Sequence, residues 1–370
     1  MSGPQQAGTS GAKPALTRDD LAATGATIAA AQLPTGAIPW FPGGQIDPWD
    51  HIEAAMGLDV VGQHDAARAA YRWLRTVQNA DGSWYRGYRE SAVDGQPTVD
   101  DYVTEANFTA YLAVGLLHHT LSTEDDSLLD ELWPTLVAAL DFVLGLQRPG
   151  GEILWARSPD GKPANEALLT GCASMFHSLR CALALARLRD EAQPDWELAA
   201  ALLGHAIAAH PERFSPRQRY SMDWYYPVLG GALRGEAALT RLNEGWPTFV
   251  VPGLGVRCVS DHPWVTGAET CELVLALCAL GDHDRAATLF TDIQHLRHAD
   301  GGYWTGYVYP DDAYWPVEQT TWTAGAVLLA SAMLAGDPAT TAVFGGADLP
   351  VAPDQTAAAC EDCSVPETTR

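Results

Sequence analysis

Apolar side chains recur every three or four positions along most of this 370-residue chain, the spacing that gathers them on one face of an α-helix. The runs end at glycine, proline or asparagine, residues that stop helices. Alternation typical of strands is confined to brief segments such as residues 302–307. The pattern predicts an all-α chain of about twelve helices, and those that can be bounded cover residues 16–32, 50–62, 65–78, 104–121, 128–147, 165–188, 196–210, 225–239, 266–280, 284–297 and 318–334.

The predicted helices are of two kinds. The runs that begin at residues 104, 165, 266 and 318 are apolar on several faces, which is typical of helices packed on both sides. Those that begin at residues 65, 128 and 284 carry Arg, Asp or Glu along one face, as a helix at a protein surface does. We therefore expect inner helices, surrounded by protein, to alternate with outer helices that face water.

A carboxylate stands at or near the start of six apolar runs, and the interval between them is about fifty residues, roughly a helical hairpin with its loops. Such a period predicts an (α/α)6 toroid, in which the first turns of six inner helices share one mouth. We place the toroid in one domain at residues 15–336, after a disordered segment 1–14 and before a flexible tail 337–370. The six acids are Asp50, Glu105, Glu166, Asp223, Glu269 and Glu318.

Composition narrows the function. Hydrophobic residues make up 47% of the chain, enough for a large core, and the formal net charge is −24. Negative charge repels nucleic-acid phosphates and anionic lipid surfaces, so we expect neither partner. No apolar run reaches the roughly 18 uninterrupted residues of a membrane span, and no secretory signal pattern is visible. We expect a soluble, cytoplasmic protein, and the sequence does not determine its oligomeric state.

The chain has seven cysteines, most of them inside apolar runs, where a free thiol behaves as a small core residue. Cys360 and Cys363 form a C-x-x-C pair in a polar segment. A zinc site needs two further ligands, and none lies near this pair in the sequence. We therefore predict no metal and no cofactor.

Several predicted outer helices end in glutamine, followed by a glycine turn and tryptophan, as in Gln78-Asn79-Ala80-Asp81-Gly82-Ser83-Trp84. This motif resembles the Gln-Trp repeat of the squalene cyclase and protein prenyltransferase superfamily, and similar turns occur in six-hairpin glycosidases. We interpret it as structural, because a glutamine amide can satisfy backbone groups left open at a helix end, and a tryptophan ring can cover the turn. The resemblance implies the toroid but no particular substrate.

The isoprenoid resemblance implies either a class II-type cyclase or a prenyltransferase-like enzyme. Squalene-type cyclases protonate an alkene with an Asp-x-Asp-Asp acid, and the nearest segment here is Thr98-Val99-Asp100-Asp101, which begins with threonine. In this alternative Asp100 or Asp101 donates the proton and aromatic rings stabilise cations. No Asp-x-Cys matches the zinc site of prenyltransferases.

The acidic mouth resembles that of six-hairpin glycosidases. Glycoside hydrolysis needs one carboxylic acid to protonate the leaving oxygen and a second carboxylate to activate water or attack the anomeric carbon. Aromatic rings stack on sugar faces, and polar side chains bind hydroxyls. We therefore predict a carbohydrate-active, glycoside hydrolase-like enzyme with a glycan or small-molecule substrate. The candidate catalytic acids are Asp50, Glu53, Asp101, Glu105, Asp223 and Glu269; the candidate substrate-binding residues are Trp40, Trp49, His51, Trp84, Asn107, Trp224, Arg257, His262, Trp264, Trp315, Glu318 and Gln319.

Position alone does not assign a catalytic acid, because an acid in the first turn of a helix also stabilises the helix dipole. Glu53 and Glu269 are favoured because each precedes a largely apolar helix and is expected to be partly buried. A third reading remains open: a sugar epimerase of the same ring fold, with His51 and His262 as acid and base, or a binding toroid without catalysis.

Overall fold

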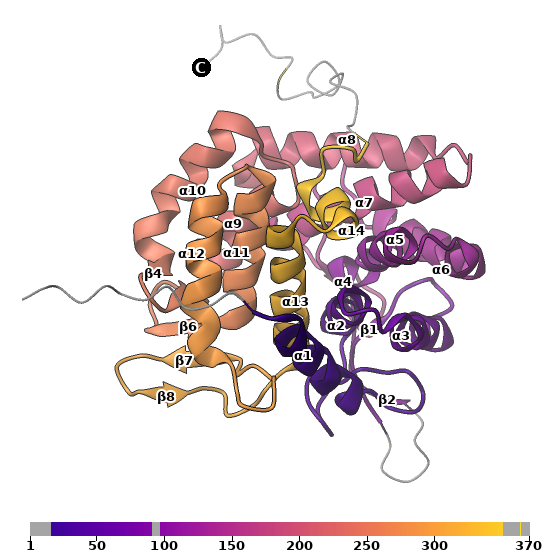
Figure 1. The fold of residues 1–370 in the computed structure, drawn as a ribbon. Helices are drawn as coiled ribbons and strands as arrows, with labels where there is room; N and C mark the ends of the chain where they lie inside the picture. Colours follow the sequence, from indigo (N-terminus) through magenta and orange to yellow (C-terminus); the bar gives the residue numbers. More distant parts are fainter. Residues whose placement is uncertain (1–15, 91–96, 351–362, 364–370) are drawn as a thin grey trace, which may run out of the picture.

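The computed structural model describes residues 16–90, 97–350 and 363. Most of these residues are helical, and two small sheets lie at one end of the helical body (Figure 1). Seven helices form an inner layer, in which each packs against the next and the last packs against the first, so that the contacts close into a ring. They are α2 (Pro48–Val60), α4 (Ala106–Ala110) with α5 (Leu112–Thr123), α7 (Leu169–Leu188), α9 (Ser221–Leu229), α11 (Gly267–Ala279) and α13 (Thr321–Ala335).

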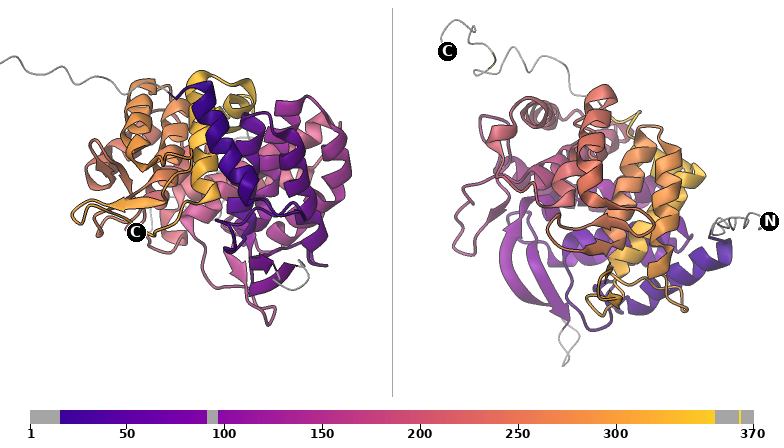
Figure 2. Two further views of the ribbon diagram at one scale, coloured as in Figure 1. Left: turned by 60° about the horizontal axis from the view of Figure 1, so that its bottom comes forward. Right: turned by 90° about the vertical axis from the view of Figure 1, so that its left-hand side faces the viewer.

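Each inner helix is covered by one outer helix (Figure 2). The predicted division holds: the runs expected to be inner form α5, α7, α11 and α13, and those expected to be outer form α3, α6 and α12. On α3 the buried residues lie on one face and arginines on the other. The outer helices are α1 (Arg18–Ala31), α3 (His64–Val77), α6 (Ser127–Leu144), α8 (Pro194–Ala209), α10 (Gly235–Phe249) and α12 (His283–Asp292), with short 3₁₀ turns η1 (Pro211–Arg213) and η2 (Ile293–Leu296).

The prediction of one interrupted helix at residues 225–239 was wrong. The α9 helix ends at Leu229 beside a glycine pair, and α10 is a separate outer helix that begins at Gly235. Ala238 and Leu242 bury the inner face of α10, while its other positions are largely exposed. The alternation of inner and outer helices therefore continues through this part of the chain.

Two antiparallel sheets lie beside the N-terminal ends of inner helices. The prediction of a helix from residue 104 was wrong at its start, because residues 97–105 form a strand of alternating exposure and the helix begins at Ala106. Strands β2 and β6 run directly into α4 and α11, so the two sheets lie at the N-terminal ends of these helices, below the helical body in Figure 1. The strands are β1 (Tyr85–Glu90), β2 (Pro97–Glu105), β3 (Ala156–Arg157), β4 (Val250–Val251), β5 (Gly255–Arg257), β6 (Trp264–Thr266), β7 (Gly306–Val308) and β8 (Ala313–Tyr314).

The structural interpretation of the Gln-Trp motif is confirmed. The Gln78 amide donates to the carbonyls of Gly82 in its own turn and Thr135 on the next outer helix, both at 2.9 Å. Trp84 is buried, and its indole N–H donates to the Leu74 carbonyl at 2.8 Å. Equivalent pairs of bonds are made by two further glutamines, Gln32 and Gln147. The fourth motif differs, because the Gln294 amide donates within its own helix and Tyr303 donates to its oxygen.

The glycine of this turn is required by geometry. Gly82 has a φ of +87°, and a Cβ at this position would lie 2.0 Å from the Ala138 carbonyl oxygen on α6. A side chain would therefore push two outer helices apart. The motif is a joint between neighbouring hairpins, which explains why it recurs with the repeat.

The prediction of a flexible tail from residue 337 was wrong for its first part. Residues 338–345 form α14 (Pro338–Thr340) and a π-helical turn, η3 (Thr341–Gly345), that packs against α5 and α11. Val343 and Phe344 are buried, and His177 lies 2.9 Å from the Val343 carbonyl. Arg180 donates to the carbonyls of residues 346, 349 and 350. Burial of these apolar side chains outweighs the Gly- and Pro-rich composition, and the remaining tail apart from Cys363 lies outside the described residues, as does segment 1–14.

One described helix, α7, is long and apolar enough to cross a membrane by length and mean composition, although polar residues interrupt its apolar sequence. Within this fold 78% of its apolar window is buried inside the protein. Its apolar surface is therefore covered by protein, since α7 lies in the inner ring between α5 and α9.

Candidate active site

Five carboxylates from two inner helices form the central acid cluster of the mouth. Asp47, Asp50 and Glu53 follow one another at intervals of three residues at the start of α2, and Glu269 and Glu272 do so on α11. Residues three apart lie on one face of a helix, so each helix presents its acids together. All but Asp50 are buried, and Asp50 is half-buried.

The acids of the two helices act on one another. Burial raises the pKa of Asp50 well above its usual value, and the nearby Asp47, Glu53 and Glu272 charges raise it further. Burial likewise raises the pKa of Glu53, with repulsion from Glu272 and Glu269. A carboxyl group that stays protonated near neutral pH can act as a general acid. The cluster is therefore chemically suited to donate a proton.

Glu272 is held by two tyrosines of α9. The Tyr226 hydroxyl donates to one carboxylate oxygen at 2.8 Å, and the Tyr225 hydroxyl donates to the other. Burial raises the pKa of Glu272 to about 8, although the tyrosine hydrogen bonds act to lower it. Because both oxygens are engaged, Glu272 is arranged to support its neighbours. Glu269 differs, since its Oε2 atom is buried without a hydrogen-bond partner among the described residues.

Glu105 lies next to the cluster at the start of α4. Burial raises its pKa to about 8, Arg86 acts to lower it, and Asp47 and Asp101 act to raise it. Asp101 itself is paired with Arg86. Burial acts to raise the pKa of Asp101, but the Val103 amide and Arg86 together lower it. Asp101 is therefore an ionised residue paired with Arg86, and this state does not suit it to donate a proton.

Aromatic rings enclose the acids. Trp49, at the start of α2, meets Phe108, Tyr111 and Tyr226 at centroid distances of 5.5–5.8 Å. Next to Phe108, the buried Asn107 amide has no hydrogen-bond partner for either its oxygen or its nitrogen among the described residues. Buried polar atoms of this kind are rare in proteins and are typical of ligand-binding sites. Trp49 and Asn107 therefore remain candidates for substrate contact.

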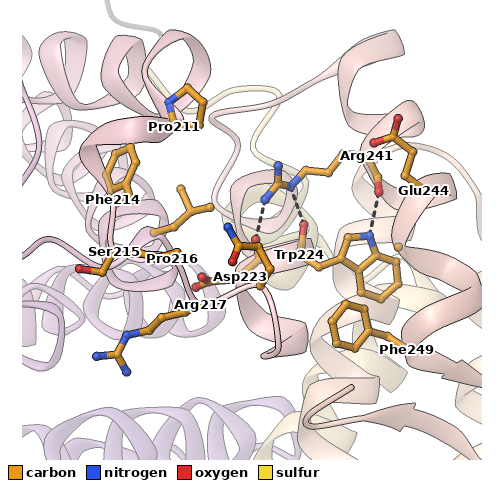
Figure 3. Close-up of a pocket in the computed structure, with 13 residues that line it drawn as sticks. Pro211, Phe214, Ser215, Pro216, Arg217, Asp223, Trp224, Arg241, Glu244 and Phe249 are labelled. Atoms are coloured by element: carbon orange, nitrogen blue, oxygen red, sulfur yellow. Dashed lines mark hydrogen bonds between the residues drawn. The ribbon is translucent and has the colours of Figure 1, made fainter. Parts of the chain in front are cut away.

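Asp223 is not part of the central acid cluster. It accepts hydrogen bonds from the Thr170 hydroxyl at 2.5 Å and the Thr170 amide at 3.2 Å. It lines a side pocket of about 370 Å³ between α7, α9 and α10 (Figure 3). Burial raises its pKa, and Thr170, Arg241 and Arg217 act to lower it. With one oxygen already held by Thr170, Asp223 does not pair with the acids of α2 and α11.

Trp224 supports the wall of the same side pocket. Its indole N–H donates to the Arg241 carbonyl at 2.8 Å, and Arg241 donates back to the carbonyls of Asp223 and Trp224 (Figure 3). Its ring stacks on Phe249 at a centroid distance of 5.2 Å. Only 6% of Trp224 is exposed, so its predicted stacking on sugar was wrong and its packing is structural.

The five-stranded sheet forms an aromatic rim. The Trp264 indole donates to the Trp315 carbonyl at 2.7 Å, and the two rings meet at 5.0 Å. Trp264 belongs to β6, which leads into the first turn of α11 with its Glu269. Arg257 on β5 donates to the Tyr309 hydroxyl. These residues therefore stand within the approach to the mouth.

Three other predicted binding residues lie away from the central acid cluster. His262 is exposed, and its Nδ1 atom lies 3.0 Å from a carboxylate oxygen of Asp261. Glu318 and Gln319 line a second pocket, of about 690 Å³, together with residues of α1. Because α1 is an outer helix, the structure does not bring these two residues to the central acid cluster.

Two predicted binding residues, Trp84 and His51, are buried and structural, so their assignment was wrong, and Trp40 helps to fix the start of α2. Trp84 caps a turn in the core, as described above. His51 accepts from the Ile38 amide at 3.0 Å and lies 2.9 Å from the Ala70 carbonyl, so both ring nitrogens are engaged, and burial lowers its pKa to about 4. The Trp40 indole donates to Asp47 at 2.6 Å. Trp40 and His51 therefore both fix the start of α2. His51 has no free ring nitrogen for acid/base chemistry, whereas Trp40 is half-buried beside Asp47 and stays a candidate for substrate contact.

The sequence reasoning missed four residues of the cluster. Asp47 caps α2, and Glu272 follows Glu269 by one helical turn, so the spacing of three residues could have identified both. Tyr225 and Tyr226 lie at the start of the helix predicted at residues 225–239, but their contact with Glu272 joins two different helices, α9 and α11. No local pattern predicts such a pairing.

The cyclase alternative lacks its acid. Asp100 is paired with Arg89, and Asp101 with Arg86, on the exposed hairpin of β1 and β2. An alkene-protonating acid must be protonated above a dry chamber, whereas these two carboxylates are paired with arginines and partly exposed to solvent. The buried acids of the mouth are the opposite case, and they suit a hydroxylated substrate.

Comparison with solved structures supports the fold. No protein-family model matches the sequence. Solved structures of a glycosidase (TM-score 0.69, 15% identity, 86% of this chain and 96% of that chain) and a D-mannose isomerase (TM-score 0.64, 12% identity, 86% and 98%) share the toroid fold. An alpha-amylase from Clostridium perfringens does so with a TM-score of 0.60 at 10% identity, over 87% of this chain and 99% of that chain.

A curated relative is much closer in sequence. The chain is 55% identical over 335 residues to the MMP endo-(1,4)-3-O-methyl-alpha-D-mannosidase of Mycolicibacterium hassiacum, and the match covers 90% of this chain and 91% of that protein. This identity and coverage place the two proteins in one family. The chain therefore belongs to the family of this endo-mannosidase and is a glycoside hydrolase.

Proposed function

We propose that this glycosidase cleaves internal α-(1,4) links in a glycan of 3-O-methylmannose. The observation that carries the proposal is the 55% identity to the Mycolicibacterium hassiacum enzyme, whose name states that substrate. We further infer that the ring of helix pairs is a full (α/α)6 toroid with its substrate channel at the N-terminal ends of the inner helices. The central acid cluster at that end supports this placement.

The rim supports a substrate with methyl ethers. Trp315 is 56% exposed and Val317 81% exposed, in the segment that carries the ring partner of Trp264. Each methyl group buried against such a surface contributes about 0.8 kcal/mol, which corresponds to roughly a fourfold gain in affinity. An apolar rim above acidic groups suits a sugar that is polar at its glycosidic oxygen and apolar at O3.

We assign the general acid to Asp50 and the base to Glu269. Asp50 has a raised pKa and is half-buried, so it can hold a proton and still meet a substrate. Glu269 has a buried oxygen without a hydrogen-bond partner among the described residues, so no other side chain occupies its lone pairs. Asp50 would give its proton to the leaving oxygen as the C–O bond breaks. Glu269 would either accept a proton from the attacking water or form a bond with the anomeric carbon that water later hydrolyses.

The acid and base can be tested separately. Asp50→Asn should lose most activity on a natural glycan but retain more on a glycosyl fluoride, whose leaving group needs no proton. Glu269→Gln should lose activity on both substrates. The matched control is Asp223→Asn, an acid at the start of another inner helix that is held by Thr170. Full activity of Asp50→Asn and Glu269→Gln on the natural glycan would reject the assignment.

The substrate can be tested with two oligosaccharides that differ only in 3-O-methylation. We expect faster cleavage of the methylated α-(1,4)-mannoside, with products from internal links identified by mass spectrometry. Trp315→Ala should reduce kcat/KM about fourfold for each methyl group that it contacts, and leave the unmethylated substrate unchanged. Equal rates on both oligosaccharides would contradict the proposed substrate.

A further inference from the structure

Two histidines and a cysteine from distant parts of the chain meet at the end of outer helix α8. His205 lies in the last turns of α8, His210 directly follows the helix, and Cys363 comes from the C-terminal segment. Their ligand atoms all lie within 4.8 Å of one another. This cluster is separate from the carboxylates of α2 and α11, and the glycosidase chemistry does not use it.

From this convergence we infer that His205, His210 and Cys363 form a zinc site that fastens the C-terminal segment to α8. The Cys363 Sγ atom lies 3.4 Å from His205 Nε2 and 3.5 Å from His210 Nε2. Around a tetrahedral zinc ion with Zn–S of about 2.3 Å and Zn–N of about 2.05 Å, sulfur and nitrogen are separated by about 3.6 Å. The observed separations therefore match two edges of a zinc tetrahedron.

The surroundings of His210 favour a metal ligand. Its Nδ1 atom lies 3.1 Å from the Glu212 carboxylate, which accepts hydrogen bonds and cannot donate when ionised. The proton of the neutral ring is therefore on Nδ1, and the lone pair of Nε2 faces Cys363. A carboxylate on the far nitrogen of a metal-binding histidine is a common arrangement, because it fixes the ring and makes the ligating nitrogen more basic.

Hydrogen bonding alone would need a mixed arrangement, in which the Cys363 thiol donates its one proton to one imidazole nitrogen and the other imidazole donates its N–H to the sulfur. A thiolate with two neutral imidazoles is a ligand set that zinc prefers, with water or another group completing the fourth position. The sequence prediction of no metal rested on the lack of ligands near the C-x-x-C pair; α8 supplies two ligands from more than 150 residues away. The other cysteine of that pair, Cys360, lies outside the described residues.

The test uses the full-length protein, purified without metal-affinity chromatography and dialysed against zinc. We expect about one tightly bound zinc ion per chain by elemental mass spectrometry. His205→Ala and Cys363→Ser should each lose it, and His283→Ala, which removes an exposed histidine of α12, should keep it. Glycosidase activity of the variants serves as the check that they fold.

Cobalt substitution gives a second readout. Co²⁺ in the wild-type protein should show a thiolate charge-transfer band, and this band should be missing in Cys363→Ser. The inference is overturned if the wild-type chain retains no stoichiometric zinc after dialysis. It is equally overturned if His205→Ala and Cys363→Ser bind as much zinc as His283→Ala, since the metal would then be held elsewhere.

Discussion

The turn that joins α3 to β1 offers a sharp test of how the hairpins are held together. In Gly82→Ala, the new Cβ would lie 2.0 Å from the Ala138 carbonyl oxygen, in a backbone with a φ of +87°. A left-handed φ costs an L-residue about 1–2 kcal/mol, and forcing an atom into a packed interface costs about 1–3 kcal/mol more. We therefore expect a loss of about 2–5 kcal/mol in the free energy of unfolding.

The matched control is Gly62→Ala. Gly62 has a similar φ of +76°, but no atom lies within 4 Å of an added Cβ. Only the backbone cost applies there, about 1–2 kcal/mol. The two variants should therefore differ by the steric contribution alone, about 1–3 kcal/mol.

The assay is urea unfolding followed by circular dichroism, with thermal unfolding as a second measure. Gly82→Ala should unfold at a clearly lower urea concentration than Gly62→Ala, and its Tm should be several degrees lower. If the two variants were equally stable, the close approach of the turn to α6 would not contribute to stability. The account of the Gln-Trp motif as a joint between hairpins would then fail.

Three further outcomes are expected. Glu105→Gln should stabilise the protein at pH 8 and have no effect at pH 4 in urea unfolding. Burial raises the pKa of Glu105 from its usual 4.5 to about 8, so the stability of the wild type falls as the pH rises between these values; equal effects at both pH values would contradict this. Tyr226→Phe should cost about 1.5–3 kcal/mol at pH 9, where Glu272 is ionised, and less at pH 6, and a loss independent of pH would argue against this hydrogen bond. Gln78→Ala should cost about 1–3 kcal/mol of unfolding free energy, because it removes the amide that donates to the carbonyls of both Gly82 and Thr135, and an unchanged urea midpoint would refute this bridging role.

The acid–base assignment also shows which site residues a sequence pattern can predict and which it cannot. Acids in the first turns of apolar helices indicated Asp50, Glu53 and Glu269, and the structure brings these three together. The same pattern indicated Asp223, which the structure places in a side pocket with Thr170. The first turn of a helix attracts acids for capping as well as for catalysis, so the pattern cannot separate the two uses.

The sequence by itself determined the repeat of helix pairs, the inner and outer character of most helices and the structural Gln-Trp turns. These features depend on local periodicity and on groups within one turn, such as Gln78 with Gly82. Only the tertiary structure decided which acids form one cluster, that Tyr225 and Tyr226 hold Glu272, and that Cys363 meets His205 and His210. The physical reason is distance along the chain: these contacts join segments tens to more than a hundred residues apart, and closure of the ring brings them together.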